Sequence, residues 1–141
     1  MAANTQPIYS RVADIQWITG ITTANTTQDL TAGTNYLAFT ADSTNGGYLY
    51  SLRFMPIRAI AASTATVAVI WMNNGSTTGT AANNIMIDNI SLPAVTTSAT
   101  VANNVFDVSV MKPIPAGYRV YVTIHTGSTN GWMCVSFGGK Y

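Results

Sequence analysis

The stretch that decides the fold class is residues 117–141, GYRVYVTIHTGSTNGWMCVSFGGKY. From Tyr118 to Ile124 apolar residues alternate with polar or aromatic ones, which is the period of two expected of a half-buried strand. Residues 127–131 are turn-forming, and an extended apolar run resumes at Trp132. The stretch therefore predicts a β-hairpin whose last strand closes the fold.

The same alternation recurs along the rest of the chain. It predicts six further strands, over Val12–Ile18, Asn35–Ala41, Tyr48–Met55, Thr66–Met72, Ile85–Leu92 and Val105–Met111. The alternation of the fifth segment is imperfect, which predicts a bulge near Asp88 or Asn89. The alanine-rich residues 57–65 predict a short helical turn.

About eight short strands joined by several long loops, without an amphipathic helix, predict an all-β protein. This pattern favours a jelly-roll β-sandwich of about eight antiparallel strands, and an immunoglobulin-like sandwich is the alternative. Residues 1–10 are polar and contain Pro7, so they predict an extended N-terminal arm. Residues 11–141 are then a single domain.

Charged residues make up only 8% of the chain, against about 25% in ordinary soluble domains, and the net charge is +1. A near-neutral surface of hydroxyls and amides favours association, most simply as a homo-oligomer, although a monomer with such a surface is the alternative. The six Lys and Arg residues are scattered and form no basic stripe, so a nucleic-acid partner is not expected. The single cysteine, Cys134, is expected to be a small buried residue of a strand.

The sequence has no apolar run of 18 residues and does not start with a basic, then apolar, leader. We therefore expect no membrane partner and synthesis in a cytoplasm.

Catalytic groups are sparse. His125 lies beside the predicted turn and no nucleophile elbow is present, so an exposed strand-end histidine is the simplest interpretation. The five aspartates occupy strand ends and loops, at Asp14, Asp29, Asp42, Asp88 and Asp107. One His and one Cys do not make a zinc site. We expect no enzyme activity, no cofactor and no metal.

The aromatic residues leave a sugar-binding platform open. The residues that could build it are Trp17, Trp71, Trp132, Tyr36, Tyr48, Tyr50, Tyr118 and Tyr121, and replacement of Trp132 or Tyr121 would test it. Packing in the core or between subunits is the alternative. Tyr48 and Tyr50 alternate in step with Leu52 and Phe54, which predicts that all four face the core.

Taken together, several short segments resemble small structural proteins of tailed bacteriophages. They are Pro7–Arg11, Ile21–Thr26, Gly46–Tyr48, Leu52–Phe54, Pro115–Tyr118 and the closing Gly138–Tyr141. The resemblance implies a jelly-roll decoration or cement protein of the virion, often a homotrimer, that binds the major capsid protein on the outer surface of the head. Ile8 and Tyr9 of the arm, with Arg11 directly after it, would then contact the shell or a neighbouring subunit. Some similar proteins belong to tails or fibres, which implies the alternative of a carbohydrate- or receptor-binding component. The resemblance implies no catalytic residues.

Overall fold

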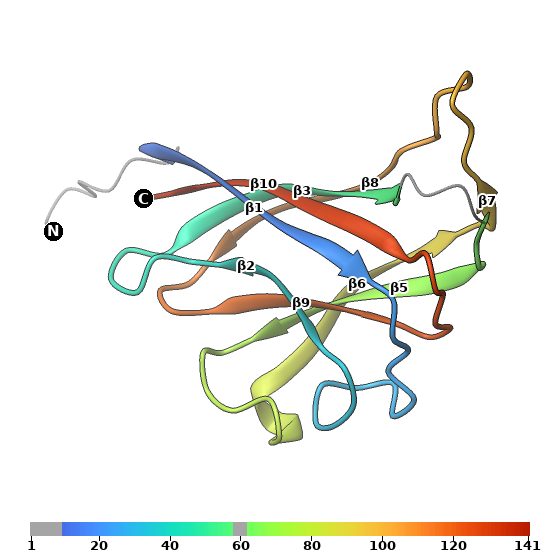
Figure 1. Ribbon diagram of the computed structural model, residues 1–141. Coiled ribbons are helices and arrows are strands. Elements are labelled where there is room, and N and C mark those ends of the chain that lie inside the picture. The colour runs from blue at the N-terminus through green and yellow to red at the C-terminus, as the bar shows by residue number, and fades with distance from the viewer. Residues whose placement is uncertain (1–9, 58–61) are drawn as a thin grey trace, which may run out of the picture.

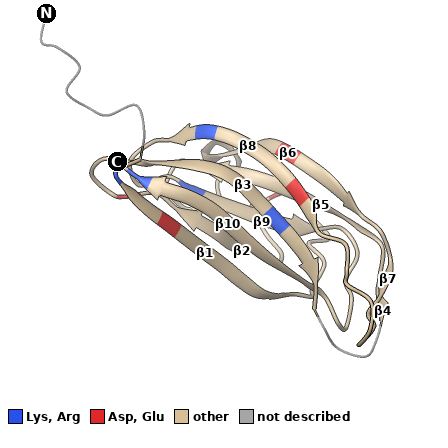
Figure 2. Cartoon of the chain, turned by 90° about the horizontal axis from the view of Figure 1, so that it is seen from above, with Lys and Arg blue, Asp and Glu red and all other residues tan. Residues whose placement is uncertain are grey.

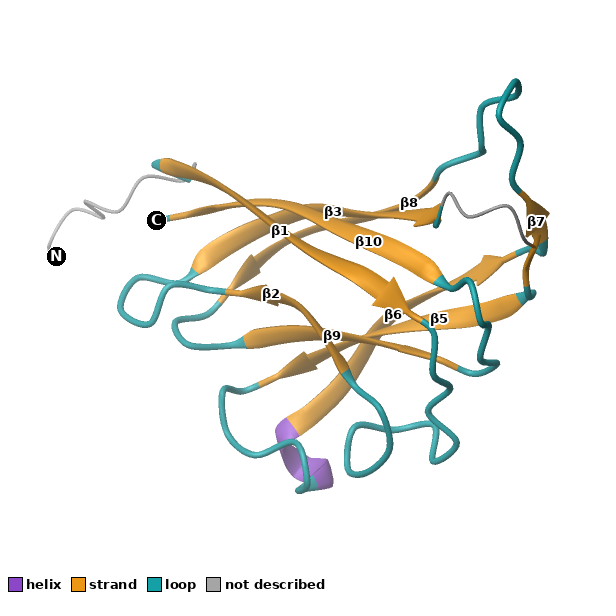
Figure 3. Ribbon diagram, viewed as in Figure 1, coloured by secondary structure: helices purple, strands orange, loops and turns teal. Residues whose placement is uncertain are grey.

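The computed structural model describes residues 10–57 and 62–141 (Figure 1). Eight strands of five to ten residues form the body: β1 (Val12–Ile21), β2 (Tyr36–Thr40), β3 (Gly47–Pro56), β5 (Thr66–Asn73), β6 (Asn84–Leu92), β8 (Phe106–Ile114), β9 (Arg119–Ile124) and β10 (Trp132–Lys140). Three short elements lie between them: β4 (Ala62–Ser63), β7 (Val95–Thr96) and the 3-10 helix η1 (Ala81–Asn83). Figure 3 shows that strands and loops make up nearly all of the described chain.

The long strands form two four-stranded antiparallel sheets that pack face to face. We call them sheet A, in the order β1-β10-β3-β8, and sheet B, in the order β2-β9-β5-β6. Among the eight long strands the first pairs with the last, the second with the seventh, the third with the sixth and the fourth with the fifth. This nested pairing is the jelly roll, so the predicted fold class is confirmed and the immunoglobulin-like order is excluded.

The predicted hairpin of residues 117–141 is wrong in one respect. Both strands are present, but β9 pairs with β2 and β5 in sheet B, whereas β10 pairs with β1 and β3 in sheet A. The segment 125–131 therefore crosses from one sheet to the other. Turn-forming residues suit either connection, and the partner of a strand is set by contacts far away in sequence.

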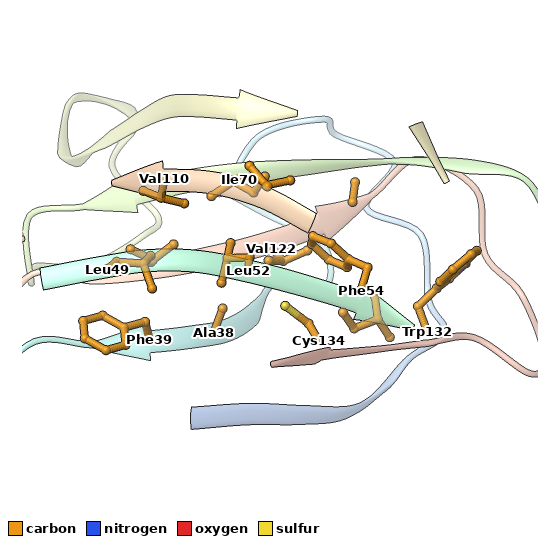
Figure 4. Close-up of a cluster of buried hydrophobic side chains, with 14 of the residues drawn as sticks. Ala38, Phe39, Leu49, Leu52, Phe54, Ile70, Val110, Val122, Trp132 and Cys134 are labelled. Carbon is orange, nitrogen blue, oxygen red and sulfur yellow. The ribbon is translucent and has the colours of Figure 1, made fainter. Parts of the chain in front are cut away.

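The core fills the space between the sheets (Figure 4). Alternate residues of β9, namely Val120, Val122 and Ile124, are fully buried, as their pattern predicts. From sheet A, Phe54, Trp132 and Cys134 enter the same cluster. Each buried aliphatic or aromatic side chain contributes roughly 1.5–3 kcal/mol to the hydrophobic stabilisation of the fold.

Bulges change which residues of a strand face the core. In β3 the pairing with β10 leaves Tyr50 as an extra residue, because Ser51 pairs with Phe137 and Leu49 pairs with Gly138; Leu52 and Phe54 are buried as predicted but Tyr48 and Tyr50 are not. The prediction that both tyrosines face the core is wrong, because an extra residue reverses the alternation on one side of it.

The bulge predicted in β6 near Asp88 is present one residue earlier. Trp71 of β5 pairs with Met86 and Ile70 pairs with Asp88, which leaves Ile87 without a counterpart in the pairing.

The predicted helical turn over residues 57–65 is not found among the residues of that segment that the structure describes. Ala62 and Ser63 form the short strand β4, which pairs with β7. Residues 58–61 lie outside the described residues.

Candidate interaction surface

The outer surface of sheet A is built from strand residues that alternate with the core residues. Trp17 of β1 pairs with Val135 of β10, which pairs with Arg53 of β3. The neighbouring row runs from Ile15 through Phe137. Residues in register lie on the same face of a sheet, so these side chains point away from sheet B.

Apolar side chains dominate the part of this outer surface that β1 and β10 form, and the same rows continue into polar residues on β3 and β8. Trp17 is 67% exposed and Ile15 is 51% exposed, whereas Cys134 and Ser136, the alternate residues of the adjacent strand, are 0% exposed. The apolar residues Ile15, Trp17, Met55, Met133, Val135 and Phe137 together are called the sheet A face below. A contiguous exposed apolar patch of this kind marks an interaction site on a soluble protein.

One ion pair crosses the sheet A face. Arg53 Nε donates a hydrogen bond to Asp107 Oδ1 at 2.8 Å, and Arg53 Nη2 donates one to Asp107 Oδ2 at 2.9 Å. The hydrogen bonds from Arg53 hold the pKa of the Asp107 carboxyl below its ordinary value. The Arg53 guanidinium also lies 5.7 Å from the centre of the Phe137 ring. Figure 2 shows how sparsely charged positions are distributed over the sandwich.

At one end of the sheet A face lie Tyr48 and Tyr50, whose ring centres are 4.8 Å apart. Ser10 Oγ is 3.2 Å from the Tyr50 hydroxyl, and the N–H of the exposed Arg11 donates to the carbonyl of Lys140 at 2.7 Å. Arg11 therefore lies where β1 begins, next to the end of β10. The other two arm candidates, Ile8 and Tyr9, lie outside the described residues.

At the opposite end, the loop between β7 and β8 rises beside sheet A (Figure 1). A cavity of about 220 Å³ separates Ala102 and Val105 of this loop from Met55 and Met133 of the sheet. The loop thus extends the sheet A face with further apolar surface, since Val105 is exposed.

The structure does not bring the two sugar-platform candidates together. Trp132 is 0% exposed and packs edge to face against Phe106, with ring centres 5.7 Å apart. It is a core residue and cannot stack on a sugar. Tyr121 is half-buried on the outer surface of sheet B, in a row with Leu37, Trp71 and Met86.

His125 is exposed, as the sequence predicts, and lies in a shallow pocket of about 430 Å³ lined by residues that include Val67, Leu92 and Pro93. Across residues 10–57 and 62–141, no three His, Cys, Asp or Glu side chains are grouped so that they could hold a metal ion.

The five aspartates have structural partners. Asp29 accepts hydrogen bonds from Thr31, Asp42 accepts from the N–H groups of residues 44 and 45, and Asp88 accepts from the next N–H of the chain. Asp107 pairs with Arg53, and Asp14 accepts from Gln16. Turn formation and pairing account for all five carboxylates.

Within the described part of the chain, no helix has the length and apolar character needed to cross a membrane.

The sheet A face was not identified from the sequence. The alternation of Ile15 and Trp17 with Asp14 and Gln16 did indicate two different faces of the strand. It could not show that Gln16 is the residue that turns toward sheet B, because the partners of its side chain lie on another strand.

No protein-family model and no curated protein matches the chain. Among solved structures, a chain from the infectious bursal disease virus Gx strain is similar over 92% of this chain, with 12% identity and a TM-score of 0.34. A chain from the Gt strain of the same virus is similar over 92%, with 14% identity and a TM-score of 0.31. This chain spans about a third of the length of each, 34% and 32% respectively. At these scores the likeness concerns the broad all-β architecture alone.

Proposed function

We propose that this chain is a non-enzymatic structural protein of a virion, which decorates and stabilises the outer surface of a bacteriophage head by binding the major capsid protein. The observation that carries the proposal is a near-neutral, charge-poor jelly roll that leaves apolar side chains uncovered on the outer surfaces of both sheets, among them Trp17 on sheet A and Met86 on sheet B. The sequence resemblance to small structural proteins of tailed phages supports the same role.

The physical argument concerns what such a surface can bind. A protein that covers many identical positions on a capsid shell needs a surface of complementary shape, hydrogen-bonding groups and exposed apolar area. Charge-poor surfaces provide these with little dependence on ionic strength, because salt screens only charges. The five carboxylates are engaged in turns and pairs, so none of them stands out as an acid or base for catalysis.

The sugar-binding alternative has less support. Of its two test positions, Trp132 is a buried neighbour of Phe106 and Tyr121 is half-buried on the outer surface of sheet B, so a platform would have to use other aromatic residues such as Trp17. We therefore retain the head-decoration role as the proposed function.

Co-sedimentation with purified heads that lack this chain tests the proposal. We expect saturable binding that changes little between about 0.1 and 0.5 M salt, since few charges take part. Removal of residues 1–10 should weaken binding while the thermal transition stays the same. Absence of binding by the full chain would contradict the proposed function, and full occupancy by the truncated chain would exclude the arm as a contact.

A further inference from the structure

We propose that the sheet A face is the interface of a two-fold symmetric dimer, and that its occupant is a second copy of this chain. This inference goes beyond the proposed function and does not depend on it, because a dimer can form whether or not the chain binds a head. It rests on the apolar character, the charge distribution and the size of the face, and on the state of the neighbouring strand edge.

The apolar character is continuous across β1 and β10 and reaches β3 at Met55. Trp17 and Val135 are in register, as are Ile15 and Phe137, and Met133 is in register with Met55 of β3. Scattered apolar residues are normal on a protein surface, but a contiguous patch is normally covered. Trp17, at 67% exposed, is an aromatic anchor of the kind that dominates interface energies.

The charge distribution favours a second copy over a charged partner. Arg53 and Asp107 neutralise each other through two hydrogen bonds within one protomer. A second copy can therefore cover them without leaving a buried charge unpaired, which would be costly. Equal and opposite charges side by side also make the face self-complementary, as a two-fold interface requires. A nucleic acid or an anionic membrane would instead need a positive surface.

The size of the face fits a reversible dimer. The whole outer surface of sheet A, with the sheet A face and the polar residues of β3 and β8 beside it, consists of four strands about 4.8 Å apart and about eight residues long, so it measures roughly 19 by 26 Å, or about 500 Å² in projection. Two copies packed together then bury about 1,000 Å² or more, which is the lower limit for a specific interface. An interface of this area predicts a dimer whose population depends on concentration.

The exposed edge of β1 is a poorer candidate for a subunit interface than the sheet A face. Gln16 of β1 makes two hydrogen bonds to the backbone of Thr40 in β2, so this side of the sandwich is bridged by its own side chain. A three-fold ring, implied by the phage resemblance, would need two different complementary surfaces.

Sedimentation velocity of the full chain over about a hundredfold concentration range tests the inference. We expect a reversible monomer–dimer equilibrium for the natural sequence. Trp17→Glu and Ile15→Glu should each weaken the dimer at least tenfold, because each places a charge in the apolar interface. Both residues are more than half exposed in the protomer, so the fold should tolerate either change.

Met86→Glu is the matched control, since Met86 is 53% exposed on the outer surface of the other sheet. It should leave the dimer unchanged, and circular dichroism should show that all three variants are folded. A monomer at every concentration, a trimer, or an equal loss with Met86→Glu would each overturn the inference. A dimer that fails to bind heads would contradict the proposed function and leave the inference standing.

Discussion

The side-chain amide of Gln16 pairs with both backbone groups of Thr40. Its Nε2 donates to the Thr40 carbonyl at 3.0 Å, and its Oε1 accepts the Thr40 N–H at 3.0 Å. These are the two bonds that a neighbouring strand would make, so the amide joins the edge of sheet A to the edge of sheet B. Ser136 strengthens this connection between the two sheets, because its hydroxyl lies 3.0 Å from the Gln16 carbonyl oxygen and 2.7 Å from the Ala38 carbonyl oxygen.

Replacing Gln16 should therefore destabilise the sandwich. Gln16→Ala removes the partners of a part-buried N–H and C=O, and we expect a loss of about 1–3 kcal/mol in the free energy of unfolding. Urea denaturation measures it. Thr19→Ala, at an exposed position of the same strand, is the control and should change stability by about 0.5 kcal/mol or less. Equal urea midpoints for the two variants would show that the Gln16–Thr40 hydrogen bonds do not contribute to the stability of the fold.

Gly138 allows two chain segments to approach closely. A Cβ at this position would lie 2.7 Å from the carbonyl oxygen of Tyr48 and 2.8 Å from Phe39 Cε2, and the tyrosine carbonyl belongs to the backbone of a paired strand. Gly138→Ala should cost about 1–3 kcal/mol through overpacking.

The control for that change is Gly79→Ala, because the nearest atom to a Cβ there is 3.5 Å away. Thermal unfolding should separate the two variants clearly. A Gly138→Ala protein as stable as the Gly79→Ala protein would contradict the close packing of β10 on Phe39.

Cys134 should be inert in the folded protein. Burial raises the pKa of its thiol to about 12, so at neutral pH almost none of it is the reactive thiolate. A chromogenic disulfide reagent should react with this thiol only after denaturant is added. Rapid stoichiometric reaction of the native protein would show that the middle of β10 is accessible.

Stability should fall in acid. The pKa values of Asp29, Asp42 and Asp107 lie below their ordinary value of 3.8, chiefly because of hydrogen bonds from Thr31, from the Asn45 backbone and from Arg53 respectively. The unfolded chain then binds more protons than the native one in acid, so this stabilisation is present above about pH 4 and is lost as the pH falls below it.

Denaturation midpoints at about pH 7 and about pH 3 measure this effect. Asp29→Asn should lower the midpoint at pH 7 and show a smaller further loss in acid, because the variant has no carboxylate to protonate at that site. A variant that loses as much stability in acid as the natural sequence would contradict the contribution of Asp29.

The sequence was sufficient for the number of long strands and for their approximate positions, since alternation is a local property. It was not sufficient for pairing. The turn chemistry of residues 127–131 suits a hairpin as well as a crossover, and contacts of β9 and β10 with strands about a hundred residues earlier decide between them.

The exposed face was harder to predict than the fold. Tyr50 is the extra residue of β3 in its pairing with β10, and this bulge turns Tyr48 and Tyr50 outward although their alternation with Leu52 is perfect in the sequence. Trp132 was a candidate for binding because tryptophans often are, yet its position in β10 directs it into the core. Ile8 and Tyr9 lie outside the described residues, so their role stays a prediction.

The central claim is that the uncovered apolar face of this jelly roll serves assembly on a phage head, and an electron cryo-microscopy map of the intact particle tests it most directly. The account predicts density for the sandwich on the outside of the head, with Trp17 and Ile15 covered by a neighbouring chain. A map that places the chain on the tail, or that leaves Trp17 facing solvent on every copy, would contradict it.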